Sequence, residues 1–220
     1  MNTQLARILS ATLHPLLMPT ILFGIIFYAA PEAIPNLDTL NQGTAVDLLG
    51  LKISIKLGLV LLIFNFTFLL PAYLIYVLYR FGAIQSLEMQ TLKDRRQPYL
   101  ITTLVYTLIC LFFAFRLGQL PELTLILMSI TLCIAAVTVI SLYWKISAHS
   151  VGISGMLGAV MGLLLKLGVM RLFYPMLILM VIAGFLLSAR LYLNAHTPNQ
   201  VMAGFALGLF ISLLTILVFV

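Results

Sequence analysis

The chain has 220 residues, of which 63% are hydrophobic and only 8% are charged, and its mean hydropathy is +1.17. A chain this apolar cannot cover itself with a water-soluble surface, so a soluble globular protein is excluded and a lipid bilayer is predicted as the solvent. The net charge of +6 comes from isolated Lys and Arg residues near the ends of apolar runs. We therefore expect membrane lipids and their phosphates as partners, and no nucleic acid.

Apolar runs long enough to cross a bilayer recur along the chain, since one helical crossing takes about 20 residues. The predicted crossings are residues 8–30, 57–79, 98–115, 123–143, 150–165, 172–190 and 200–219. Six crossings remain the alternative, because the third and fifth runs are short for a span. The predicted fold class is therefore all-α: a polytopic membrane helical bundle with six or seven transmembrane helices, forming a single domain over residues 1–220.

The first run follows Arg7 and continues past residue 25 without a small-residue cleavage site, which predicts a retained anchor and not a cleaved signal peptide. Residues 31–50 form the one long loop, and their turn-rich composition without strand or helix periodicity predicts a connector. Cys110 and Cys133 lie inside apolar runs, so neither a disulfide framework nor a CxxC pair is indicated.

Three further polar segments interrupt the apolar pattern, at residues 80–98, 145–150 and 190–199. Two predicted crossings separate each segment from the next. By parity all three emerge on the same side of the membrane, and this shared side is the first indication of a functional site.

The residue types in these segments suit an anion held at helix ends. In the third segment, Arg190 and His196 stand six residues apart where one helix ends and the next begins. In the second, Ser147 can cap a new helix whose free N–H groups and positive dipole end favour an anion beside His149. In the first, three cations precede Pro98, a residue able to open the next helix. These cations are Lys93, Arg95 and Arg96.

The three segments, in this order and on one face, resemble the three signature motifs of the type 2 phosphatidic acid phosphatase (PAP2) superfamily. Arg190, five further residues, His196 and the Val201–Gly204 tail are similar to the third motif. Ser147-Ala148-His149 is similar to the Pro-Ser-Gly-His second motif with its Pro and Gly replaced. The resemblance covers about residues 90–220, which would form a PAP2-like core after two N-terminal crossings in residues 1–80.

The sequence departs from the family pattern at two positions. The first motif places a Lys seven residues before an Arg-Pro pair, whereas Gln97 precedes Pro98 here, so Lys93 and its neighbouring arginines are an approximate counterpart. The third motif ends in an Asp four residues after its His, and Gln200 occupies that position. In the family that Asp orients the histidine and stabilises its cationic form, whereas a neutral amide can supply only the orientation.

The resemblance implies a metal-independent phosphatase without a cofactor, acting on a lipid phosphate or lipid diphosphate. His196 would attack phosphorus to give a phosphohistidine, and His149 would protonate the leaving oxygen. Cations and capping groups would hold the phosphoryl oxygens. These groups are Arg190, Ser147, Lys93, Arg95 and Arg96, and Lys145 is a further candidate because it lies one helical turn before His149.

A substrate with its phosphate at headgroup depth and its tails in the bilayer fits a site at helix ends better than a soluble ester does. Phosphatidate, phosphatidylglycerol phosphate, a polyprenyl diphosphate and a lipid A phosphate all qualify. Two other functions stay open: a catalytically weakened or inactive relative that binds or moves lipid phosphates, and a transporter or metal-binding protein that uses His14, His149 and His196. We expect an integral protein of a bacterial inner membrane, with the side of the site left open by the distribution of Lys and Arg.

His14 precedes Pro15 near the start of the first crossing, and a kinked, hydrogen-bonded structural role outside the site is predicted for it. Small residues spaced four apart predict close helix crossings that hold the helices of His149 and His196 together. The pairs are Gly155 with Ala159, Gly158 with Gly162, and Gly204 with Gly208.

Overall fold

Seven helices long and apolar enough to cross a membrane form the described part of the chain, which confirms the predicted helical membrane bundle. The computed structural model describes residues 1–37, 46–48, 51–89 and 91–220. The seven spans are Thr3–Ala29, Ile55–Arg80, Leu92–Arg116, Pro121–Ile140, Ala148–Leu167, Met170–Tyr192 and Pro198–Phe219. The two runs that look short in the sequence are therefore helices of 25 and 20 residues.

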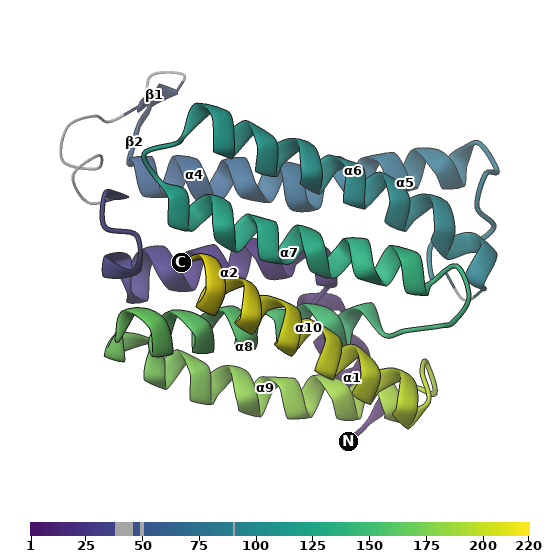
Figure 1. The fold of residues 1–220 in the computed structure, drawn as a ribbon. Coiled ribbons are helices and arrows are strands. Elements are labelled where there is room, and N and C mark those ends of the chain that lie inside the picture. Colours follow the sequence, from purple (N-terminus) through teal and green to yellow (C-terminus); the bar gives the residue numbers. More distant parts are fainter. Residues whose placement is uncertain (38–45, 49–50, 90) are drawn as a thin grey trace.

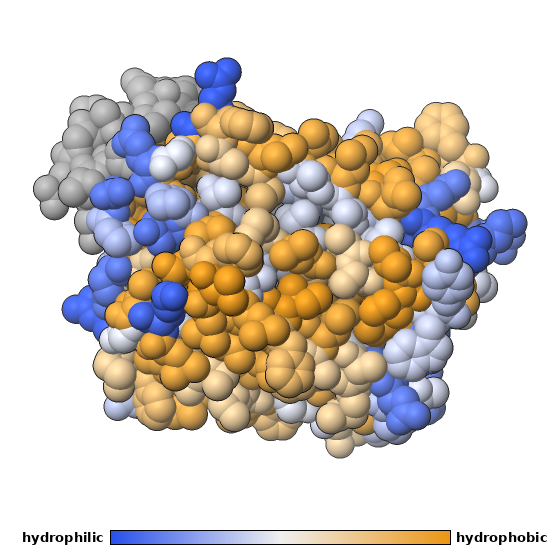
Figure 2. All heavy atoms as spheres, in the orientation of Figure 1, coloured by the Kyte–Doolittle hydropathy of each residue, from blue (hydrophilic) through white to orange (hydrophobic). Residues whose placement is uncertain are grey.

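The long helices lie side by side (Figure 1). They are α4 (Ile55–Phe64), α5 (Leu70–Arg80), α6 (Leu92–Arg116), α7 (Pro121–Ile140), α8 (Ala148–Leu167), α9 (Phe173–Tyr192) and α10 (Pro198–Phe219). Figure 2 shows hydrophobic side chains across the middle of the visible face and hydrophilic ones gathered at its two ends. This distribution fits a bilayer whose hydrocarbon core surrounds the middle of the helices.

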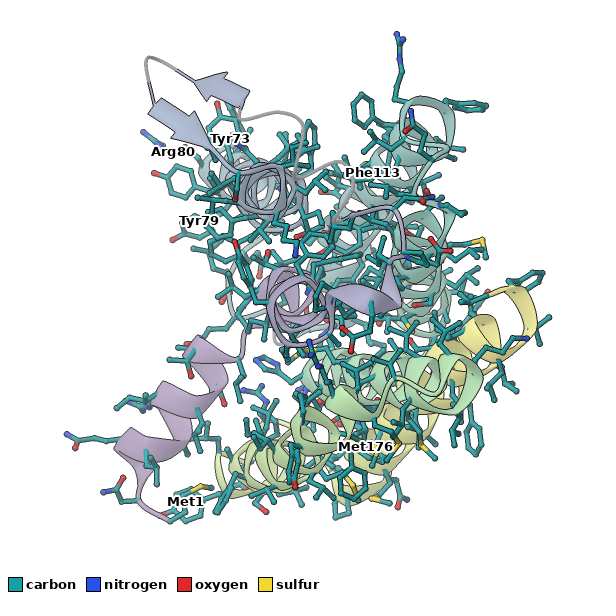
Figure 3. The ribbon with its side chains drawn as sticks, turned by 90° about the vertical axis from the view of Figure 1, so that its left-hand side faces the viewer. Met1, Tyr73, Tyr79, Arg80, Phe113 and Met176 are labelled. Carbon is teal, nitrogen blue, oxygen red and sulfur yellow. The ribbon has the colours of Figure 1, made fainter. Side chains whose placement is uncertain are left out.

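The first span is bent, at the Pro15 position where the sequence predicts a kink. It consists of α1 (Thr3–Thr12), the 3₁₀ turn η1 (Pro15–Leu17) and α2 (Met18–Ala29). The cause is Pro15, which has no N–H for a helical hydrogen bond and clashes with the preceding turn. Figure 3 looks along the bundle and shows α2 end-on but α1 side-on, so α1 runs across the direction of the other helices.

The loop over residues 31–50 connects the first two spans, and it contains short regular elements that the sequence does not indicate. It begins with a 3₁₀ turn, η2 (Pro31–Ala33), and contains β1 (Val46–Leu48), which pairs antiparallel with β2 (Leu51–Ile53). The alternation of apolar and polar residues in each strand is only three residues long, too short to distinguish from a loop in the sequence. Residues 38–45 and 49–50 lie outside the described residues.

The start of α6 also differs from expectation, because Pro98 does not open the helix. Thr91 caps it instead, with its Oγ1 accepting the N–H of Asp94 at 3.2 Å. The cluster of cations before Pro98 therefore lies in the first helical turns and not in a loop, so neighbouring cations point in different directions.

The centre of the bundle is α8, of which 67% is buried in its most apolar window, against 28–33% for the other spans. It packs on α10 through glycines that leave no room for a side chain. A Cβ at Gly158 would lie 2.5 Å from the Leu209 carbonyl oxygen, and one at Gly204 would lie 2.9 Å from the Ser147 carbonyl oxygen. Close packing of the helices that carry His149 and His196, predicted from the small residues, is confirmed at these positions.

Candidate functional site

The three polar segments meet at one end of the bundle. Figure 1 draws the α5–α6, α7–α8 and α9–α10 connections at the right-hand end, where α1 also lies. Parity along the chain therefore predicts their common side correctly. The Ser147 N–H, just before α8, also donates to the Gln200 carbonyl oxygen at 3.4 Å, which ties the second segment to the third.

His196 is held in a defined tautomer by Gln200. The Gln200 Oε1 atom accepts the backbone N–H of Thr197 at 3.1 Å, as part of the capping box that begins α10, so this atom is the amide oxygen. The His196 Nδ1 atom lies 3.2 Å from the same oxygen and must therefore carry the hydrogen of that bond. In the neutral ring this leaves the lone pair on Nε2, the nitrogen available for attack.

The surroundings of His196 favour its neutral form. The side chain is only 8% exposed. Burial, together with the positive charges of Arg95 and Arg190, lowers the pKa of His196 to about 4, against a weaker opposing effect of the hydrogen bond to Gln200. At neutral pH the ring is therefore an unprotonated base and nucleophile.

His149, in the first turn of α8, is tied to α1. Its Nε2 atom lies 3.0 Å from the Ser10 carbonyl oxygen, and because a carbonyl can only accept, Nε2 carries a hydrogen. The Nδ1 atom of His149 is then the nitrogen left to exchange a proton. His149 lies within electrostatic range of Arg190, His14 and His196, so the predicted histidines share one site region.

Ser147 acts as the predicted cap, since its Oγ accepts the Ser150 N–H at 3.4 Å. The Ser147 residue is fully buried. Its position at the α8 N-terminus places the free N–H groups of the first turn next to His149, where the helix dipole favours negative charge.

His14 lies next to His149, a neighbour that the sequence analysis does not give it. Its ring centroid is 6.0 Å from that of His149, in an edge-to-face arrangement. The His14 Nδ1 atom accepts the Leu16 N–H at 3.3 Å, so the predicted role at the kink is also present. The bend at Pro15 turns α1 back over the end of the bundle and brings His14 to His149, an arrangement that no spacing in the sequence indicates.

Two arginines supply positive charge, and neither has a carboxylate partner among the described residues. Arg95 is 5% exposed and donates its Nε–H to the Met89 carbonyl oxygen at 2.8 Å and an Nη1–H to the Ile146 carbonyl oxygen at 3.1 Å. The Nε atom of Arg190 is buried and has no hydrogen-bond partner within the described chain. Both arginines act electrostatically on His196 and on the half-buried Tyr99 ring.

Lys145 adds a third cation. Burial, with the charges of Arg95 and Arg190 nearby, lowers the pKa of Lys145 from its ordinary value. The ion pair found among the described residues joins Arg171 to Glu32 at 3.6 Å, at the opposite end of the bundle. Three neighbouring, partly or wholly buried cations without a carboxylate partner in the described part of the chain favour a bound anion, because charge removed from water is costly unless it is compensated.

The other two predicted cations do not converge on the histidines. Arg96 is exposed and donates an Nη2–H to the Leu142 carbonyl oxygen at 3.2 Å. Lys93 is exposed and lies beside Asp94, whose carboxylate accepts the Gln85 N–H and the Thr91 hydroxyl. Of the first segment, Arg95 is therefore the residue that faces the site.

A metal site has no support in this geometry. In the described part of the chain, no three side chains among His, Cys, Asp and Glu gather closely enough to hold a metal ion.

Comparisons with known proteins found no match: no protein-family description, curated protein or solved structure matches the chain.

Proposed function

We propose that this chain is a PAP2-type phosphatase that removes phosphate from a lipid phosphate or lipid diphosphate in a bacterial inner membrane. The observation that supports this most is a neutral His196, with Nε2 free, beside three cations that have no carboxylate partner in the part of the chain that the structure describes. Such a group combines a nucleophile with fixed positive charge, the two requirements of phosphoryl transfer.

In the first step, the phosphoryl oxygens bind to Arg190, Arg95, Lys145 and the N–H groups at the start of α8. The lone pair of His196 Nε2 attacks phosphorus, and the bond from phosphorus to the lipid oxygen breaks. The Nδ1–H bond to Gln200 holds the ring so that Nε2 points at the phosphorus. The result is a phosphohistidine and a departing lipid alkoxide or lipid phosphate.

His149 supplies the proton that the leaving oxygen needs. Because its Nε2–H is held by the Ser10 carbonyl, the proton comes from Nδ1 of the cationic ring. The negative charge of a bound phosphate offsets the nearby cations and stabilises that cation. A water then attacks the phosphohistidine, gives its proton to His149 Nδ1, and releases inorganic phosphate from His196.

The position of the site supports a lipid substrate over a soluble one. The anion-binding groups lie at the end of seven helices long enough to cross a membrane, at the depth of lipid headgroups. An ester whose tails remain in the bilayer reaches this depth without leaving the membrane.

The test is phosphate release by the detergent-purified protein from a panel of lipid phosphates and diphosphates in the presence of EDTA. We expect release from at least one lipid, loss of release in His196→Ala and in His149→Ala, and no loss in Arg171→Gln, whose charge lies at the far end of the bundle. Acid-labile ³²P on wild-type protein but not on His196→Ala would identify the intermediate. Release that disappears with EDTA, or survives His196→Ala, contradicts the proposal.

A second candidate is a protein that binds or moves lipid phosphates without cleaving them. It is favoured by Gln200, which orients His196 but supplies no negative charge to stabilise its cationic form. For this function, lipid-phosphate binding would persist while no phosphate is released by wild-type protein. Gain of turnover in Gln200→Asp would then indicate a weakened enzyme, and its absence a dedicated binder.

A further inference from the structure

A polar residue faces outward from the middle of the second span. Asn65 is exposed and lies near the centre of the 26-residue span Ile55–Arg80, far from either headgroup region. The outward side of α6 is different, because its exposed residues at this depth are leucines. They are Leu100, Leu104, Leu108 and Leu111.

Asn65 begins a π-helical turn, η3 (Asn65–Leu69), and polar groups of this turn that face the bundle are hydrogen-bonded within it. The Thr67 hydroxyl donates to the Ile63 carbonyl oxygen at 2.8 Å, and the Tyr106 hydroxyl of α6 donates to the Thr67 carbonyl oxygen at 2.8 Å. In the described residues, the Asn65 side-chain amide has no such partner. It is left facing hydrocarbon, where an unpaired amide is costly.

Asn65 lies on a continuous outward face of α4 and α5, which we call the Asn65 face. Its members are spaced three or four residues apart and are Leu61, Asn65, Leu69, Tyr73 and Tyr76. Figure 3 shows Tyr73 at the outer side of α5. The tyrosines lie toward the headgroup region, where aromatic rings are common, and the leucines suit contact with lipid tails. Asn65 is therefore the residue of this face that contact with lipid alone does not account for.

We infer that a second copy of this chain docks on the Asn65 face, so that the two Asn65 amides bond to each other across a twofold axis. Copies inserted in the same orientation are related by an axis along the membrane normal, which places each residue at the same depth as its counterpart. An amide both donates and accepts, so Asn65 is complementary to itself. A different partner would have to present a polar group at this same depth.

The leucines and tyrosines of the Asn65 face supply the surrounding contact. In hydrocarbon, helices associate through side-chain packing and interhelical hydrogen bonds, since lipid tails are as apolar as leucine. The face lies on α4 and α5, whereas the candidate site is built from α1, α6, α8, α9 and α10, so the two copies would keep separate sites.

The test is the association of purified protein in liposomes, followed by single-molecule photobleaching over a range of protein-to-lipid ratios. We expect wild-type protein to form dimers and Asn65→Leu to weaken them at least about fivefold, equivalent to about 1 kcal/mol. Asn65→Gln, which keeps an amide, should restore part of the association. Leu108→Ala on the leucine face of α6 is the matched control and should leave it unchanged.

Cross-linking gives a second measurement that keeps Asn65 in place. Oxidation of Leu69→Cys with copper phenanthroline in liposomes should produce a covalent dimer, whereas Leu108→Cys and wild-type protein should not. A monomeric wild type, or equal dimer fractions in wild type and Asn65→Leu, overturns the inference. Neither measurement depends on phosphate release, so this result and the result for the proposed function are separable.

Discussion

His196 and Gln200 are joined by a hydrogen bond of 3.2 Å between Nδ1 and Oε1. The same amide oxygen accepts the Thr197 N–H, so one atom both completes the cap of α10 and sets the tautomer of His196. The capping box is a local feature of helix stability, and here it is also the device that leaves His196 Nε2 free.

Gln200→Glu should raise the pKa of His196 from about 4, because a carboxylate in the same place stabilises the cationic ring. The change keeps the length of the side chain and both hydrogen bonds. We expect a rise of at least about one unit, measured by NMR titration of ¹³C- and ¹⁵N-labelled histidine in detergent. A Gln200→Leu control removes the acceptor and should lower phosphatase turnover at least about tenfold through loss of the tautomer. An unchanged pKa in Gln200→Glu would show that the amide oxygen does not bond to His196.

Stability should fall as the pH is lowered from about 6.5 toward 4. The pKa of His196 is lowered to about 4 in the folded protein from an ordinary value of 6.5. In this window the unfolded chain takes up a proton that the folded chain does not, so protonation favours unfolding. The melting temperature in detergent at pH 5 should be lower than at pH 7 by about 2 °C or more.

His196→Gln separates this effect from the titration of other groups, because glutamine does not bind a proton. The variant should show a smaller difference in melting temperature between pH 7 and pH 5 than wild-type protein. An identical difference in both proteins would mean that His196 is protonated equally in the folded and unfolded states.

Arg190→Met should reduce phosphate binding without loss of stability. The Arg190 side chain has a buried Nε without a partner, so removing its charge removes a desolvation cost while methionine retains much of the apolar stem. We expect a melting temperature at least equal to that of wild-type protein in phosphate-free buffer. Added phosphate should raise the melting temperature of wild-type protein, and the variant should need at least about tenfold more phosphate for the same rise.

Arg171→Met serves as the control for Arg190→Met, since the Arg171 side chain is largely exposed and pairs with Glu32 at the far end of the bundle. It should leave the response to phosphate unchanged. Equal responses to phosphate in wild type and Arg190→Met would remove Arg190 from the anion site.

Gly208→Ala should destabilise the contact between α8 and α10. A Cβ at this position would overlap the Val151 carbonyl oxygen and the Ser154 hydroxyl, neither of which can move freely. Overpacking of this kind costs about 1–3 kcal/mol, and the melting temperature should fall by several degrees. Gly184→Ala on the exposed side of α9 meets no atom within 4 Å and should have little effect. Equal melting temperatures for the two variants would contradict the close helix contact.

The sequence by itself determined the number of crossings, the common side of the three polar segments, and the close packing of α8 on α10. These features depend on the hydropathy of about 20 consecutive residues, on counting spans, and on small residues one helical turn apart. The Ser147 cap and the position of Gln200 four residues after His196 can also be predicted from the sequence, because each depends on residues that are close together in the chain.

Only the tertiary structure decided which side chains meet at the site. Arg95 is buried while Lys93 and Arg96 are exposed, because all three lie in the first turns of α6, where successive residues point in different directions. His14 and the Ser10 carbonyl lie close to His149, although Ser10 is 139 residues away from His149 in the sequence. The bend at Pro15 places α1 beside the start of α8. The rotation of a helix and the direction of a bend are set by packing against distant helices, which apolar periodicity in one segment does not specify.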